Sequence, residues 1–135
     1  MTAQNRGPVR DCMRRDVAEV DGKIDVMSAL KMMKKAGTTS LIVKRRHQHD
    51  EYGMVSFADI AKYVIAKDRA PERVNVYEIM SKPVLTVRPD MEIRYCARLF
   101  ERFGISHAPV VENDKIIGLV SYYLLVLHGL PDLDD

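Results

Sequence analysis

The chain has 135 residues, of which 47% are apolar, and its formal net charge is +2. These values suit one compact domain or two tightly joined halves, each with an ordinary globular core. No run approaches the roughly 18 consecutive apolar residues of a membrane helix, and the start lacks the apolar region of a secretory signal. We therefore expect a cytoplasmic protein without membrane insertion. The basic residues are scattered and tryptophan is absent, which argues against a nucleic-acid-binding protein.

The first half of the chain shows one ordered series of elements. Residues 1–8 are polar and without periodicity, which indicates a flexible tail. A short strand at 17–20 precedes a helix whose apolar residues recur at helical spacing from Val26, and an apolar run at 40–44 is typical of a buried strand. After a polar connection, a further strand ends at Ser56, which is expected to cap the next helix.

The second half repeats the first. Apolar positions match between the halves, and so do glycines and a serine, namely Gly37 with Gly104, Gly53 with Gly118 and Ser56 with Ser121. The sequence therefore predicts an α/β (α+β) fold of two β-α-β-β-α repeats, at 9–68 and 76–128. A linker at 69–75 joins them, and an acidic tail follows at 129–135. Because one repeat of about 60 residues buries too little surface to be stable alone, we expect a pseudo-two-fold pair packed through its sheets.

The repeated phrases resemble those of the cystathionine-β-synthase (CBS) domain pair, also called a Bateman module. The resemblance rests on the openings VRDCM and VYEIM, the phrases GMVSFAD and GLVSYYL, and the segment GISHAPVV. It implies a stand-alone regulatory module that binds an adenosine-containing ligand (AMP, ADP, ATP or S-adenosylmethionine) in the cleft between the repeats. It also implies a homodimer that serves in energy sensing and modulates a separate, unidentified partner protein.

The resemblance also implies which residues hold the ligand. Asp59 would bind the ribose, since a carboxylate can accept charge-assisted hydrogen bonds from both neighbouring hydroxyls. Ser56 would lie on the phosphate side, at the start of a helix. The other implied contacts are Ser81, Pro83 and Val84 on the adenine side, and Thr39, Ser40, Ser106 and His107 on the phosphate side.

The two repeats differ at the ribose position, because Leu124 stands where the first repeat has Asp59. We therefore expect one competent cleft and a weak or empty second cleft near Ser121, Arg15 and Asp16. Ser106 also replaces a basic residue that the family often has. Phosphate binding would then depend on His107, or on Arg45, Arg46 and Lys82, and a monophosphate or a cationic adenosyl ligand is favoured over a triphosphate.

Some of these residues have a structural alternative. Ser56 with Asp59 is also the pattern of a capped helix start that needs no ligand, although Ser121 begins the equivalent helix without an acid. A core histidine bonded to backbone is the equal alternative for His107. The alternative function is accordingly a ligand-free dimerisation or scaffold module that has kept the fold.

The sequence predicts no catalytic residue, no catalytic cofactor and no metal site, and hence a protein that is not an enzyme. It has no G-x-S-x-G phrase, no phosphate-loop motif and no zinc signature. His47, His49 and Asp50 lie close together, but no fourth ligand follows at a known spacing, which favours a solvated loop. Cys12 and Cys96 occupy unmatched places in the repeats and are interpreted as buried thiols.

Overall fold

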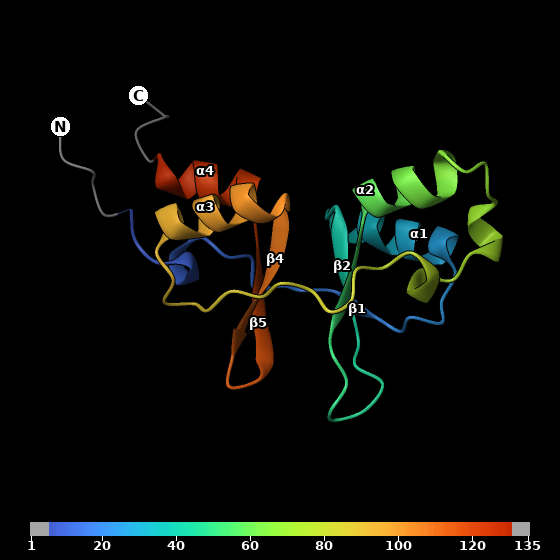
Figure 1. Cartoon of the computed structure of the whole chain (residues 1–135), viewed down its shortest axis with the longest axis horizontal. Helices are drawn as coiled ribbons and strands as arrows, with labels where there is room; N and C mark the ends of the chain where they lie inside the picture. Colours follow the sequence, from blue (N-terminus) through green and yellow to red (C-terminus); the bar gives the residue numbers. More distant parts are fainter. Residues whose placement is uncertain (1–5, 131–135) are drawn as a thin grey trace. The chain divides into compact units, whose positions relative to one another are not determined.

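The computed structural model describes residues 6–130, and the outer parts of the predicted tails, at 1–5 and 131–135, lie outside the described residues. The described chain forms two compact units. The central unit is Ala18–Val84, and the terminal unit consists of residues 6–17 and 85–130. Each unit combines helices with a small sheet (Figure 1), which confirms the predicted fold class. Between residues 6 and 130, no helix has the length and apolar character needed to cross a membrane.

The compact units do not coincide with the two sequence repeats. The short 3-10 helix η1 (Val9–Asp11) opens the first repeat, yet its first residue donates a 2.7 Å backbone hydrogen bond to Met91 in the terminal unit. Its counterpart η4 (Val76–Glu78) opens the second repeat, and its first residue donates a 2.9 Å hydrogen bond to Ile24 in the central unit. Each repeat thus contributes its opening turn to the unit that contains the other repeat's sheet.

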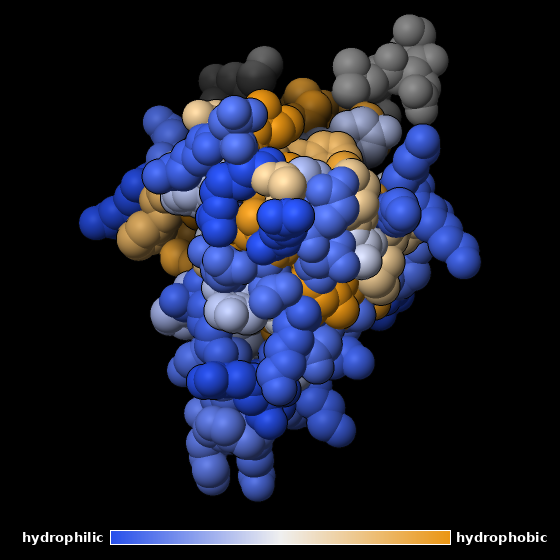
Figure 2. All heavy atoms as spheres, turned by 90° about the vertical axis from the view of Figure 1, so that its right-hand side faces the viewer, coloured by the Kyte–Doolittle hydropathy of each residue, from blue (hydrophilic) through white to orange (hydrophobic). Residues whose placement is uncertain are grey.

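The central unit is built on a three-stranded sheet in the order β1-β2-β3. Strand β1 (Glu19–Val20) is parallel to β2 (Ser40–Val43), and β2 is antiparallel to β3 (Gly53–Ser56). Helices α1 and α2 lie on the same side of these strands, and the β2–β3 loop extends away from them (Figure 1). Seen from this unit's outer side, the surface is mostly hydrophilic, with small separate apolar patches (Figure 2).

The helices of the central unit begin and end where local chemistry predicts. Helix α1 (Val26–Ala36) starts at Asp25, whose carboxylate accepts a 2.8 Å hydrogen bond from the Ser28 N–H, and ends at Gly37, whose φ is 67°. Left-handed backbone of this kind favours glycine. Helix α2 (Phe57–Ile60) continues as the π-helical segment η2 (Ala61–Ile65), where the sequence predicted one regular helix.

The terminal unit is built on a two-stranded sheet. Strand β4 (His107–Glu112) pairs with the antiparallel strand β5 (Lys115–Ser121) through a tight turn whose two residues both have positive φ. Helix α3 (Ile93–Phe103) ends at a left-handed glycine, and α4 (Tyr122–Gly129) follows β5 directly.

The strand predicted at 84–87 is reduced to a single residue. Val87 forms one parallel bridge to Val110, with a 3.0 Å hydrogen bond to the Pro109 carbonyl and a 2.9 Å hydrogen bond from the Val111 N–H. The segment is bounded by prolines at 83 and 89, which have no N–H to extend a ladder. The terminal sheet therefore lacks the third strand that the sequence suggested.

Both cysteines lie in the core of the terminal unit. Cys12 and Cys96 are buried and free, as the sequence indicated. Burial is the main cause that raises the pKa of the Cys12 thiol to about 11 and that of the Cys96 thiol to about 12. Both thiols are therefore protonated at neutral pH, in the form that reacts poorly as a nucleophile.

Candidate ligand-binding site

Ser56 and Asp59 form a reciprocal cap at the start of α2. The Ser56 N–H and hydroxyl donate to Asp59 Oδ2 at 2.9 and 3.1 Å, and the Asp59 N–H donates to Ser56 Oγ at 3.3 Å. Ser56 and Asp59 therefore do form the helix cap that needs no ligand. All of the side-chain contacts use Oδ2, and Oδ1 of this half-buried carboxylate has no hydrogen bond from any residue between 6 and 130. One carboxylate oxygen is fixed and the other can accept from a ligand.

The equivalent helix of the terminal unit is capped by serine alone. Ser121 Oγ accepts a 3.3 Å hydrogen bond from the Leu124 N–H, and no acid occupies the third helical position. Helix α4 nevertheless forms a regular helix of eight residues. An acid at this position is therefore not required for the helix to begin, which leaves Asp59 available for a further role.

Thr39 and Ser40 lie at the same end of the central sheet as the α2 cap. Ser40 is the cross-strand partner of Ser56, and the Thr39 carbonyl accepts a 3.0 Å hydrogen bond from the Phe57 N–H. Directly opposed residues of antiparallel strands present their side chains on one face. Ser40 Oγ is buried and has no hydrogen-bond partner in the described part of the chain. The structure thus brings four of the predicted residues together, with Asp59 as the fourth.

Of the residues predicted on the adenine side, Ser81 lies at the free edge of β3. Ser81 exchanges backbone hydrogen bonds of 3.0 and 2.8 Å with Met54, two residues before the α2 cap. A side chain at Gly53 would place its Cβ 3.3 Å from the Ser81 carbonyl oxygen, so the glycine permits this close approach. Ser81 and Pro83 are exposed and Val84 is half-buried. The bridge places Ser81 beside β3, and because it is antiparallel, the chain after Ser81 runs away from the α2 cap. The adenine-side role of Ser81, Pro83 and Val84 stays a prediction.

Ser106 and His107 occupy the corresponding end of the terminal sheet. His107 pairs across the strands with Ser121, just as Ser40 pairs with Ser56. The His107 ring nitrogen Nδ1 lies 2.9 Å from Ser106 Oγ, and the imidazole is half-buried. His107 thus occupies in the terminal sheet the register position that Ser40 occupies in the central sheet.

Arg15 and Asp16 are exposed in the segment between η1 and β1. Asp16 accepts hydrogen bonds of 2.8 and 3.1 Å from Arg14, and this interaction is the main cause that lowers the pKa of the Asp16 carboxyl. The carboxylate is already paired with a cation, so it is a poor candidate for binding a ribose.

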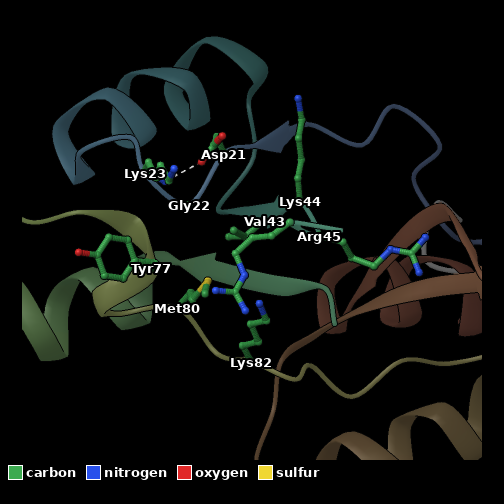
Figure 3. Close-up of a pocket in the computed structure, with 10 residues that line it drawn as sticks. Asp21, Gly22, Lys23, Val43, Lys44, Arg45, Tyr77, Met80 and Lys82 are labelled. Atoms are coloured by element: carbon green, nitrogen blue, oxygen red, sulfur yellow. Dashed lines mark hydrogen bonds between the residues drawn. The ribbon is translucent and has the colours of Figure 1, made fainter. Parts of the chain in front are cut away.

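Arg45, Arg46 and Lys82 do not accompany Asp59. They line a pocket of about 770 Å³ near Val43 (Figure 3). The α2 cap lies beside Ser40, at the opposite end of β2. Ser40 and Val43 are three residue steps apart, or roughly 10 Å at about 3.3 Å per residue. Sequence reasoning named the three side chains as possible phosphate ligands but could not tell at which end of the sheet they lie.

Asp50 connects the β2–β3 loop to this pocket. Its Oδ2 accepts a 2.8 Å hydrogen bond from Lys82 Nζ and a 3.1 Å hydrogen bond from Arg46 Nε. The Arg46 hydrogen bond, followed by that from Lys82, holds the pKa of the Asp50 carboxyl well below its usual range. In the loop, His47 Nδ1 accepts a 3.3 Å hydrogen bond from the His49 N–H. Within residues 6–130, no group of three side chains is arranged to hold a metal ion.

Comparisons with known proteins agree with this architecture. The family model of the CBS domain matches residues 9–66 and 76–126. A homoserine O-acetyltransferase of Methanosalsum zhilinae is 35% identical over 117 residues, which cover 86% of this chain and 23% of that protein. The chain likewise spans less than two thirds of the length of several other curated relatives.

Two solved structures show the same fold. The hexameric CBS-CP12 protein from bloom-forming cyanobacteria has a TM-score of 0.88 and 34% identity, and the match covers 91% of this chain and 71% of that one. The CBS domain pair of protein MJ0100, in complex with 5′-methylthioadenosine and S-adenosylmethionine, has a TM-score of 0.76 and 24% identity, covering 88% of this chain and 96% of that one. With both halves matched by the family model, the chain belongs to the CBS-domain family as a tandem pair with the Bateman fold.

Proposed function

We propose that this chain is a regulatory module that binds an adenosine-containing ligand, with Asp59 holding the ribose. The proposal rests on the Asp59 carboxylate. Its Oδ2 is fixed by the α2 cap, and its Oδ1 has no hydrogen bond from any of the described residues. A carboxylate held by backbone and side-chain contacts loses little conformational freedom on binding. Its hydrogen bonds to ribose hydroxyls are charge-assisted and therefore strong.

The neighbouring groups suit the other parts of such a ligand. Ser56, Thr39 and Ser40 offer polar atoms near Asp59, and the buried Ser40 Oγ has no protein partner in the described chain. The segment Ser81–Val84 is the proposed adenine side. The resemblance assigns Ser106 and His107 to the phosphate side, and this assignment stays a prediction.

S-adenosylmethionine, 5′-methylthioadenosine and AMP are the preferred candidates. No basic side chain is among the predicted phosphate-side residues of the central unit, since Thr39, Ser40 and Ser56 are neutral, and this favours ligands with little negative charge. The MJ0100 likeness supports the fold alone at 24% identity, so the choice of ligand rests on these residues. We propose that the chain binds the ligand without transforming it. The ligand would bind one conformation of the chain more tightly than another, and this difference in affinity would set how strongly it affects a separate partner protein.

Calorimetric titration with S-adenosylmethionine, 5′-methylthioadenosine, AMP, ADP and ATP tests this function. We expect at least one of the first three to bind at one site per chain, because the terminal unit has Leu124 in place of the acid. At 100 times its dissociation constant, that ligand should stabilise the fold by roughly 2.7 kcal/mol in a thermal or denaturant assay. Absence of binding by all five at millimolar concentrations would exclude the proposed function.

Helix α4 favours a second proposal, that two copies of the chain associate through this helix. Apolar residues lie on all faces of this helix. Leu125 is buried, whereas Tyr123 is 70% exposed and Val126 and Leu127 are also exposed. We expect the natural protein to sediment as a homodimer at micromolar concentration and Tyr123→Lys with Val126→Lys to sediment as a monomer. A monomeric natural protein, or a double variant that remains dimeric, would contradict this assignment. Dimerisation without any ligand would match the scaffold alternative.

A further inference from the structure

We propose that the central unit has a second, separate binding site, for a small organic anion that combines phosphate groups with a flat apolar part. The site is the pocket of about 770 Å³ at the loop end of the sheet (Figure 3). Its size lies within the usual range of small-molecule sites, about 300–1,000 Å³. It is lined by Asp21, Gly22, Lys23, Val43, Lys44, Arg45, Arg46, Tyr77, Met80 and Lys82.

The inner wall of the pocket is apolar and contains one aromatic ring. Val43 lies between the turn at Gly22 on one side and Tyr77 with Met80 on the other (Figure 3). Tyr77 is 54% exposed, so part of its surface is available for packing. A Cβ at Gly22 would lie 3.3 Å from Val43 Cγ1 and 3.4 Å from Tyr77 Cβ. The glycine therefore keeps these walls close, and a flat group can pack against the ring.

The pocket carries a surplus of positive charge. Five of the lining side chains are basic and one is acidic. The ammonium groups of Lys23 and Lys44 are exposed and make no ion pair with any residue in 6–130. Lys44 and Arg45 leave the end of β2 in different directions (Figure 3), so they form parts of the rim. Basic groups around a concave surface concentrate field and attract anions.

Asp50 shows that the deeper cations of the pocket are arranged to receive an anionic oxygen. Its side chain is 7% exposed, and its Oδ2 accepts hydrogen bonds from Lys82 at 2.8 Å and from Arg46 at 3.1 Å. Two cations thus converge on one carboxylate oxygen from the β2–β3 loop. A phosphate group has more charge and more acceptor oxygens than a carboxylate, so it can share or displace Asp50 at these two side chains.

The terminal unit provides an internal comparison, because the repeat places an equivalent pocket there. This pocket is about 350 Å³ and is lined by one basic and two acidic side chains. In the repeat alignment Val111, Glu112 and Asn113 stand where the central unit has the three basic residues after Val43, and Asp90 stands where it has Lys23. Glu112 is also paired with Arg10 at 3.2 Å. Arg10 and Arg15 of the terminal unit stand where the central unit has Tyr77 and Lys82. The terminal unit is therefore less basic at this place, and the basic run at 44–46 is confined to the central unit.

Calorimetric titration at low salt with inorganic pyrophosphate and phenyl phosphate tests the site. We expect both probes to bind the natural protein. Lys44→Met should lower the affinity for each probe about three- to tenfold, as expected for the loss of an exposed charged contact. Lys34→Met makes the same change of charge on α1, away from the pocket, and should leave affinity within about twofold. Asp50→Asn should strengthen pyrophosphate binding, because it releases Arg46 and Lys82 from a charged partner.

Several results would overturn the proposal. One is no binding of either probe at millimolar concentration, and another is equal weakening by Lys34→Met and Lys44→Met, which would indicate general charge attraction. Tight binding of single-stranded DNA without binding of pyrophosphate would indicate a nucleic-acid surface instead. Asp59→Asn should leave both probes unaffected, so failure here and failure of the adenosyl site are distinguishable. Circular dichroism of each variant verifies that it is folded.

Discussion

Replacement of Asp59 with alanine is expected to weaken binding of the adenosyl ligand about 10- to 100-fold. The carboxylate is the charged acceptor proposed for the ribose, and hydrogen bonds to charged groups contribute roughly 1.5–3 kcal/mol, with about 1.4 kcal/mol for each factor of ten in affinity. The same variant removes the acceptor of the Ser56 N–H at 2.9 Å. It should therefore also destabilise the start of α2, by roughly 0.3–1 kcal/mol.

Asp59→Asn separates these two consequences. An asparagine oxygen can still accept from the Ser56 N–H, so the cap of α2 is kept while the charge on the ribose contact is lost. We expect near-natural stability with clearly weaker binding, measured by calorimetry with the strongest ligand of the panel. Glu72→Ala, an exposed acid elsewhere in the central unit, controls for net charge. Natural affinity in both Asp59 variants would show that the ligand is held elsewhere.

Phe100→Ala is expected to lower the free energy of unfolding of the terminal unit by about 3–5 kcal/mol. Phe100 is fully buried in the core that includes Cys96 and Val110. Its ring also meets the Tyr122 ring edge to face, with centroids 5.2 Å apart and planes at 78°. The substitution leaves a cavity among α3, α4 and the sheet, and it removes an aromatic pair that contributes about 0.5–1.5 kcal/mol beyond area burial.

Phe103→Ala provides the matched control for this prediction. Phe103 is the last residue of the same helix and is exposed, so its loss should change stability by no more than about 0.5 kcal/mol. Urea denaturation followed by circular dichroism compares the two variants. A similar loss of stability in both variants would mean that α3 does not face the sheet with Phe100 buried and Phe103 exposed.

Features that depend on local chemistry were predictable from the sequence. Gly37 and Gly104 follow amphipathic stretches, and both adopt the left-handed conformation that ends a helix, with φ of 67° and 64°. Ser56 and Ser121 precede helices, and both accept the expected hydrogen bond from the third helical residue. Such signals involve neighbours in the sequence, so a single chain is enough to identify them. The repeat then supplied the family resemblance.

Features that depend on distant contacts were not predictable. The exchange of the opening turns between units places Val9 beside Met91 and Val76 beside Ile24, and no local pattern encodes such a choice. The basic pocket combines Lys23, the run at 44–46 and Lys82, which are separated along the chain. A comparison of the two repeats at 44–46 would have revealed the charge difference, but only the fold shows that these side chains surround one pocket.

A double-mutant cycle distinguishes binding of the ribose hydroxyls by the Asp59 carboxylate from binding elsewhere. The affinities of the natural protein and of Asp59→Ala are measured for AMP, or for another ligand of the panel that binds, and for its 2′-deoxy counterpart. We predict that loss of the 2′-hydroxyl weakens binding to the natural protein about tenfold and to Asp59→Ala less than about twofold, because the variant has already lost the contact. An equal loss in both proteins would contradict the assignment of Asp59 to the ribose.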